Sequence, residues 1–168
     1  MIDLQTLLTY LTLISVPVGV IYHIMTLNNT RKTQQLQLET RQASLFQQIY
    51  SKFGEPDFIR NESAMMSFQF NDYDDFLKKY GSQANPEAFT QWMSVVRFYH
   101  GVAVLVEKGL IDIQLVYDLM GDHVIEAWEK ERIVNLEYRK RSGDYDHGRS
   151  MEILYNKLKE LKTERIQS

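Results

Sequence analysis

LQTLLTYLTLISVPVGVIYHIMTL, residues 4–27, is a run without Asp, Glu, Lys or Arg. As an α-helix it would be about 36 Å long, which exceeds the roughly 30 Å hydrocarbon core of a bilayer. The next charges are the basic pair Arg31 and Lys32, and cytoplasmic flanks of membrane helices are enriched in such residues. The run therefore predicts a single-pass anchor over residues 1–27 in the cell membrane, with the N-terminus outside and the rest of the chain cytoplasmic.

A secretory signal and a buried core helix are the alternatives to a span. A signal peptide begins with basic residues and ends at a small-x-small cleavage site, whereas this chain begins with the acidic Asp3 and has no Ala-x-Ala pattern. A helix at the surface of a globular core has one charged face, and residues 4–27 have none. Both comparisons favour the span.

The polar and small residues of this run lie on one face. At 100° per residue they fall within an arc of about 120°. Lipid cannot form hydrogen bonds, so hydroxyls and an imidazole on one side indicate a second transmembrane helix, which Ser15-x-x-x-Gly19 allows to approach closely. The predicted membrane helix-packing face is Thr12, Ser15, Gly19, His23 and Thr26, continued toward the N-terminus by Gln5 and Thr9.

Two other interpretations of this face stay open. Thr and Ser hydroxyls can bond the carbonyls four residues earlier in their own helix, and Pro17 with Gly19 can produce a kink, which would leave a lipid-facing tether. His23 is an ionisable group within the run and therefore a candidate for a proton or ion path, although no acidic partner accompanies it.

Composition predicts an all-α protein. The chain has 3 Pro and 8 Gly in 168 residues, long segments lack both, and there is no Cys, which excludes disulfides and thiolate chemistry. We expect one N-terminal transmembrane helix that continues into a cytoplasmic helix, followed by a small helical bundle. The corresponding parts are an anchor over 1–27, a helical connector over 28–53 and a cytoplasmic helical domain over 54–168.

Capping residues predict where the helices of the bundle begin and end. Gly54-Glu55-Pro56 ends the connector, Asn85-Pro86 begins the central core helix, and Gly109 follows its last turn. The expected helices cover residues 57–70, 72–80, 86–108, 112–141 with an interruption at Gly121, and 149–165. The apolar stripe of the central helix consists of Phe89, Trp92, Val96, Tyr99, Ala103 and Val106.

No familiar catalytic motif occurs, and the strongest cluster of chemically active residues is Asp118, Asp122, His123 and Glu126. Three carboxylates and an imidazole on one helix face could hold a divalent cation. The competing interpretation is a solvated charged face on which Asp122 caps a helix that restarts after Gly121. On the central helix, Arg97, His100 and Glu107 are expected to contribute an internal ion pair more readily than a catalytic group.

Charge is distributed in two blocks. Acids exceed bases over residues 54–126, and bases exceed acids over 127–168, where Arg139, Lys140 and Arg141 lie together. With acids interspersed and a net charge of −3, the pattern is not that of a nucleic-acid-binding protein. The basic residues of the last helix either face anionic lipid or form a solvated helix face.

FYHGVAVLVEKGLIDIQLVYDLMGDHVIEAWE, residues 98–129, resembles a family of prokaryotic single-span membrane proteins of unknown function. The similar features are the aromatic-rich helix, the pair Leu105-Val106, the segment from Gly109 to Asp112, the segment from Val116 to Leu119, and the Trp128-Glu129 pair. Gly54-Glu55-Pro56 is similar too. The resemblance implies a short outer N-terminus, one span and a small all-helical cytosolic domain, and it implies no catalytic residues.

These observations predict a membrane-anchored interaction protein without catalytic activity, either a homo-oligomer or an accessory subunit of a membrane complex. Its partners would be the lipid bilayer and another transmembrane helix, with no nucleic acid, cofactor or evident small-molecule substrate. The alternatives are a membrane-tethered enzyme or metal-dependent effector that uses the cluster Asp118, Asp122, His123 and Glu126, and a signalling component whose long helix transmits motion.

Overall fold

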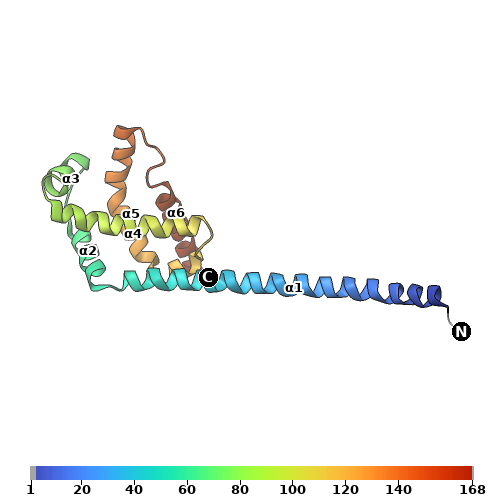
Figure 1. Cartoon of the computed structure of the whole chain (residues 1–168). Helices are drawn as coiled ribbons and strands as arrows, with labels where there is room; N and C mark the ends of the chain where they lie inside the picture. The colour runs from blue at the N-terminus through green and yellow to red at the C-terminus, as the bar shows by residue number, and fades with distance from the viewer. Residues whose placement is uncertain (1–2, 168) are drawn as a thin grey trace. The chain divides into compact units, whose positions relative to one another are not determined.

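The computed structural model describes residues 3–167, apart from the side chains of residues 6, 7, 10–12 and 14. Within this range the chain forms six α-helices and no strand, which confirms the all-α class (Figure 1). It divides into two compact units, one ending at Ala43 and one beginning at Ser44. This division lies inside the expected connector.

The first helix, α1 (Leu4–Phe53), runs without interruption through Pro17. The predicted transmembrane helix is nevertheless wrong, because none of the helices in the described part of the chain is both long enough and apolar enough to cross a bilayer. The span was predicted from the absence of charge in the run, but Asn28, Asn29, Arg31 and Lys32 follow it in the same helix and lower the mean hydropathy of the described residues. The predicted single-pass topology required this transmembrane helix.

Cap residues act at most of the predicted boundaries of the second unit. Helix α2 (Pro56–Ser67) begins at a proline, and α3 (Tyr73–Tyr80) begins where the Asp72 side chain accepts a hydrogen bond from the Asp75 amide. In α4 (Pro86–Glu107) the Asn85 side chain accepts a hydrogen bond from the Ala88 amide at 3.1 Å. The predicted helix over 57–70 is too long at its C-terminal end, because α2 stops at Ser67.

The end of α4 and the beginning of the next helix also follow the prediction. Gly109 has φ +67°, and the Leu110 amide donates a hydrogen bond to the Leu105 carbonyl at 2.9 Å, which is the Schellman arrangement. Helix α5 (Ile113–Ser142) begins where Asp112 accepts from the Gln114 amide at 2.8 Å. The last helix is α6 (Arg149–Gln167).

The predicted interruption at Gly121 is wrong, since α5 is continuous from Ile113 to Ser142. Gly121 is buried, and a Cβ atom there would lie 3.4 Å from the Tyr117 ring. A glycine inside a helix costs only about 1 kcal/mol relative to alanine, and tertiary packing routinely outweighs that cost. It follows that Asp122 is not an N-cap.

Helix α4 is the central core element, as predicted. It packs against α2, α3, α5 and α6, and α5 runs across it (Figure 1). Its buried side chains include Trp92, Val95 and Tyr99. The C-terminal end of α1 belongs to this unit, because Phe46, Ile49 and Phe53 pack against the buried core.

Candidate functional site

The predicted packing face lies on the first unit. Ser15, His23 and Thr26 are exposed there, while the side chain of Thr12 is outside those that the structure describes. The Thr26 hydroxyl donates to the Tyr22 carbonyl at 2.8 Å, which is the bond within one helix that the tether interpretation requires. At Gly19, an added Cβ atom would meet no other atom within 4 Å.

Large apolar side chains are exposed over the same part of α1. They surround the polar face. A monomeric protein rarely exposes so many apolar side chains in one segment, and such surfaces mark interaction sites. The exposed residues are Leu4, Leu8, Leu13, Val16, Val18, Val20, Ile21, Tyr22, Ile24, Met25, Leu27, Leu36 and Leu38.

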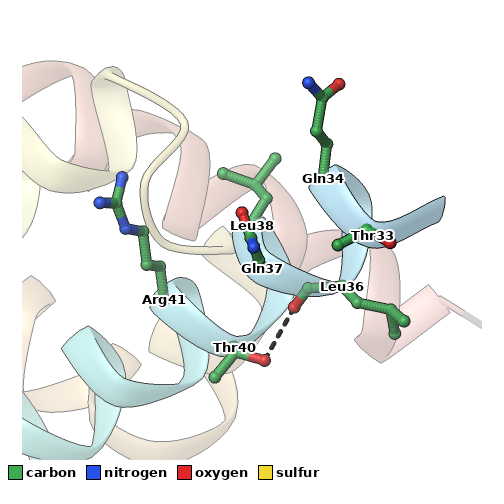
Figure 2. A pocket seen from close by; sticks show the side chains of 7 residues that line it. All are labelled: Thr33, Gln34, Leu36, Gln37, Leu38, Thr40 and Arg41. Carbon is green, nitrogen blue, oxygen red and sulfur yellow. Dashed lines mark hydrogen bonds between the residues drawn. The ribbon is translucent and has the colours of Figure 1, made fainter. Parts of the chain in front are cut away.

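Further along α1 a shallow surface hollow is lined by seven residues, all from this one helix (Figure 2). The side chains of Gln34, Leu36 and Arg41 point in different directions from the helix, and the Thr40 hydroxyl donates to the Leu36 carbonyl at 2.7 Å. All its described lining residues come from this one helix, so they form an open hollow and not an enclosed pocket.

The acidic cluster of α5 forms ion pairs with the basic residues of α6. Asp118 pairs with Arg165 at 2.7 Å, and Asp122 pairs with Lys162 at 2.5 Å. His123 contacts a different residue, Glu62 of α2. Among the described residues, no group of three His, Cys, Asp or Glu side chains is placed to hold a metal ion. The structure therefore does not bring the predicted metal ligands together.

His123 is the exposed end of a polar group that includes a buried carboxylate. Glu62 accepts a hydrogen bond from the hydroxyl of Tyr99, which is fully buried, and lies 3.2 Å from His123 Nδ1. The rings of Phe53 and His123 pack edge to face, with their centroids 5.1 Å apart. Burial, followed by the hydrogen bond to Glu62, raises the pKa of Tyr99 far above its ordinary value. This group joins α2, α4 and α5.

A second buried polar group lies between α4 and α5. His100 Nε2 is 2.8 Å from Glu131 Oε1, and the same oxygen accepts from Asn135 Nδ2 at 2.9 Å. His100 thus provides the internal pair expected from the central helix, whereas Arg97 and Glu107 are exposed. Sequence reasoning did not identify Glu131 and Asn135, whose only local signal is their separation of four residues on one helix face.

Asn135 has one polar atom that is not satisfied within the chain. The residue is 3% exposed, and its Oδ1 has no hydrogen-bond partner among the residues that the structure describes. Burying an acceptor without a partner costs about 1–3 kcal/mol. A buried acceptor without a hydrogen-bond partner needs a physical explanation.

Asn135 and Glu131 line a cavity of about 330 Å³. Its remaining walls come mainly from aromatic and aliphatic side chains of α3, α4 and α5, with His147 contributed by the segment between α5 and α6. A mostly apolar cavity with a few convergent polar groups is the usual form of a small-molecule site. The other lining residues are Tyr73, Phe76, Leu77, Ser82, Phe89, Trp92, Met93, Val96, Val134 and Tyr138.

The segment that carries His147 is held in place by Arg139. Its Nε donates to the His147 carbonyl at 2.6 Å, and its Nη1 donates to Glu152 at 2.7 Å. Next to it, Gly148 has φ +69°, and an added Cβ atom would lie 2.4 Å from Asn135 Nδ2. Only glycine fits both the backbone conformation and the space beside Asn135.

Comparison with known proteins gives a family but no characterised relative. A family model with the description "Domain of unknown function (DUF4760)" matches residues 7–158. No curated protein matches the chain, and neither does any solved structure.

Proposed function

Because the match spans residues 7–158, the chain belongs to the DUF4760 family, and we propose that it is an interaction protein that self-associates through the first unit of α1. The observation that carries the proposal is the spacing of exposed apolar side chains. Leu4, Val18 and Met25 are separated by multiples of seven residues, and Ile21 is three residues after Val18. These are the a and d positions of a heptad repeat, and all four side chains are between 57% and 73% exposed.

The repeat is long enough to specify helix pairing. The intervening a and d positions, residues 7, 11 and 14, are also Leu or Ile in the sequence, although the structure does not describe those side chains. Three to four heptads are the usual minimum for a coiled-coil seam, so this repeat meets its lower limit. The next two positions are Asn28 and Lys32, so the apolar seam is confined to residues 4–25.

A second copy of this chain is the partner that fits the seam. Each a or d side chain inserts into a hole formed by four residues of a facing helix, so the partner needs the same heptad pattern. A symmetric dimer uses one surface patch on both subunits, and the copy supplies a matching seam automatically. The seam side chains are exposed within a single chain, which leaves them available for this contact.

The seam and the polar face are different surfaces of the helix. At 100° per residue, His23 and Thr26 lie about 80–140° from Val18, outside the a and d positions. The centres of the two faces are roughly 110° apart around the helix, and Ser15 lies at the edge of the seam. Substitution on each face therefore distinguishes pairing through the seam from pairing through the polar face.

The test is the molar mass of the purified full-length chain by light scattering, over a range of concentrations. We expect a multiple of the chain mass for the wild type and the monomer mass for the double variant Val18→Asn, Ile21→Asn. The matched control His23→Asn, Thr26→Asn introduces the same side chain off the seam and should keep the wild-type mass. Circular dichroism verifies that all variants remain helical.

Two outcomes would overturn the proposal. One is a monomeric wild type at all concentrations. The other is an unchanged mass for the seam variant together with dissociation of Gly19→Leu, which would assign the contact to the polar face. No step of this proposal depends on a catalytic group.

A further inference from the structure

The geometry points to a small-molecule site in the cavity between α3, α4 and α5, which takes an apolar molecule with a hydrogen-bond-donating head group, an amine or an alcohol. This inference is independent of self-association, because all its residues belong to the second unit. With about 330 Å³, the cavity lies at the lower end of the range for ligand pockets.

The walls determine the body of the ligand. Tyr73 and Phe76 come from α3, Trp92 and Met93 from α4, and Tyr138 from α5. Such side chains provide apolar contact area and aromatic faces but few hydrogen bonds. A flat or short aliphatic body therefore fits, whereas a sugar or nucleotide would leave many polar groups without partners.

The polar end determines the head group. Asn135 Oδ1 is a buried acceptor without a partner among the described residues, and Asn135 and Glu131 both line the cavity. Nδ2 of Asn135 is already used in its hydrogen bond to Glu131, so the amide orientation is fixed with Oδ1 as the atom left over. A ligand that donates a hydrogen bond satisfies this oxygen, and one that brings another acceptor does not.

Charge at this end acts against anions. Glu131 is a carboxylate with a side chain only 4% exposed, and it contacts His100. A ligand carboxylate would place like charge beside Glu131 and would meet Asn135 Oδ1 with a second acceptor. The site should therefore discriminate among molecules of one shape by their head groups.

Four probes with a common phenyl body test this discrimination on the full chain by calorimetric titration and ligand-observed NMR. 2-Phenylethylamine and 2-phenylethanol carry a donor, ethylbenzene carries no polar head, and 3-phenylpropanoate carries an anion. We expect at least one donor probe to bind at least five times more tightly than ethylbenzene and 3-phenylpropanoate. Equal or tighter binding of either non-donor probe would overturn the inference, as would the absence of saturable binding of both donor probes at millimolar concentration.

Two variants locate the binding in this cavity. Leu77→Trp should fill the mouth of the cavity and reduce donor-probe affinity at least tenfold, and Leu77 is exposed enough, at 40%, for the fold to accept the larger side chain. The matched control is Leu119→Trp, at an equally exposed position (42%) that does not line the cavity. Equal affinities of these two variants would place any binding elsewhere and overturn the inference.

Asn135→Leu tests the head-group contact itself. Leucine keeps the approximate volume and removes the acceptor. The ratio of donor-probe affinity to ethylbenzene affinity should therefore fall toward one. A preserved preference in a folded Asn135→Leu variant would show that Oδ1 does not contact the ligand. Should this variant fail to fold, the probe series on the wild type and the Leu77→Trp comparison still decide the inference.

Discussion

At the scale of single residues, the segment between α5 and α6 depends on glycines for two different reasons. Gly143 and Gly148 have φ +74° and +69°, so both occupy the left-handed region. Space beside the two residues differs: a Cβ atom at Gly143 would meet nothing within 4 Å, whereas one at Gly148 would collide with Asn135 Nδ2. Comparing them separates backbone strain from the loss of close packing.

We therefore predict that Gly148→Ala destabilises the chain more than Gly143→Ala does. Gly143→Ala should cost about 1–2 kcal/mol of unfolding free energy from left-handed backbone strain alone. Gly148→Ala adds a steric clash and should cost at least about 1 kcal/mol more. Urea denaturation followed by circular dichroism measures both. Equal costs would mean that Asn135 moves aside freely.

Tyr99 leads to a prediction about alkaline pH. Burial and its hydrogen bond to Glu62 raise the pKa of Tyr99 in the folded chain, while an unfolded tyrosine titrates near about 10. Below that pH both states hold the proton, so the contribution of Tyr99 to stability is complete. Above it the unfolded state loses the proton first, binds fewer protons than the folded state, and becomes favoured as pH rises.

We expect the free-energy difference between wild type and Tyr99→Phe to be constant from pH 7 to about 9 and to shrink above about pH 10. Denaturant titrations at several pH values measure it. Tyr145→Phe, at a position that is 71% exposed, is the control and should show no such convergence. A constant difference through pH 11 would contradict the assignment of the raised pKa to Tyr99.

At the scale of helices, local rules predicted the boundaries that caps determine and failed where tertiary packing decides. Asn85, Gly109 and Asp112 act within one turn of their own position, so sequence was sufficient for them. Gly121 was misinterpreted because it is buried in the folded chain, and its burial cannot be deduced from the neighbouring sequence. The predicted span is wrong for the described helices, because none of them is both long enough and apolar enough to cross a bilayer.

The candidate sites were less predictable than the helices. Glu131 meets His100 across 31 residues of sequence, and no local spacing indicates that contact. The heptad spacing of Leu4, Val18, Ile21 and Met25, by contrast, was present in the sequence. It was overlooked because the segment was interpreted as a membrane span. In a span, the apolar residues are expected to face lipid and the polar face is expected to contact a partner helix.

The last turns of α1 give a prediction at the same scale. Phe46, Ile49 and Phe53 pack against the core of the second unit, although they precede the Gly54-Glu55-Pro56 break. A chain truncated to residues 54–168 loses these contacts and should be less stable than one truncated to residues 44–168, by roughly 2–4 kcal/mol. Thermal and urea unfolding of the two chains compare them. Equal stability would mean that these three side chains contribute nothing to the core.

At the scale of the whole molecule, the two units differ in what stabilises their folded structure. Residues from Ser44 onward have a core of buried side chains from five helices and the end of α1, and a unit of this kind can fold alone. The first unit is a single helix without such a core. Most of the stability of helices in proteins comes from packing of an apolar face, so we expect an additional contact to stabilise this one.

Self-association through the seam provides that contact, and it makes helicity depend on concentration. A peptide of residues 1–43 should gain helical circular dichroism as its concentration rises from micromolar to millimolar, because pairing and folding are coupled. The same peptide with Val18→Asn and Ile21→Asn should remain weakly helical throughout, and the chain of residues 44–168 should be helical and monomeric at every concentration. Helicity of the wild-type peptide that is independent of concentration would separate helix formation from pairing, and association of residues 44–168 alone would move the contact to the second unit.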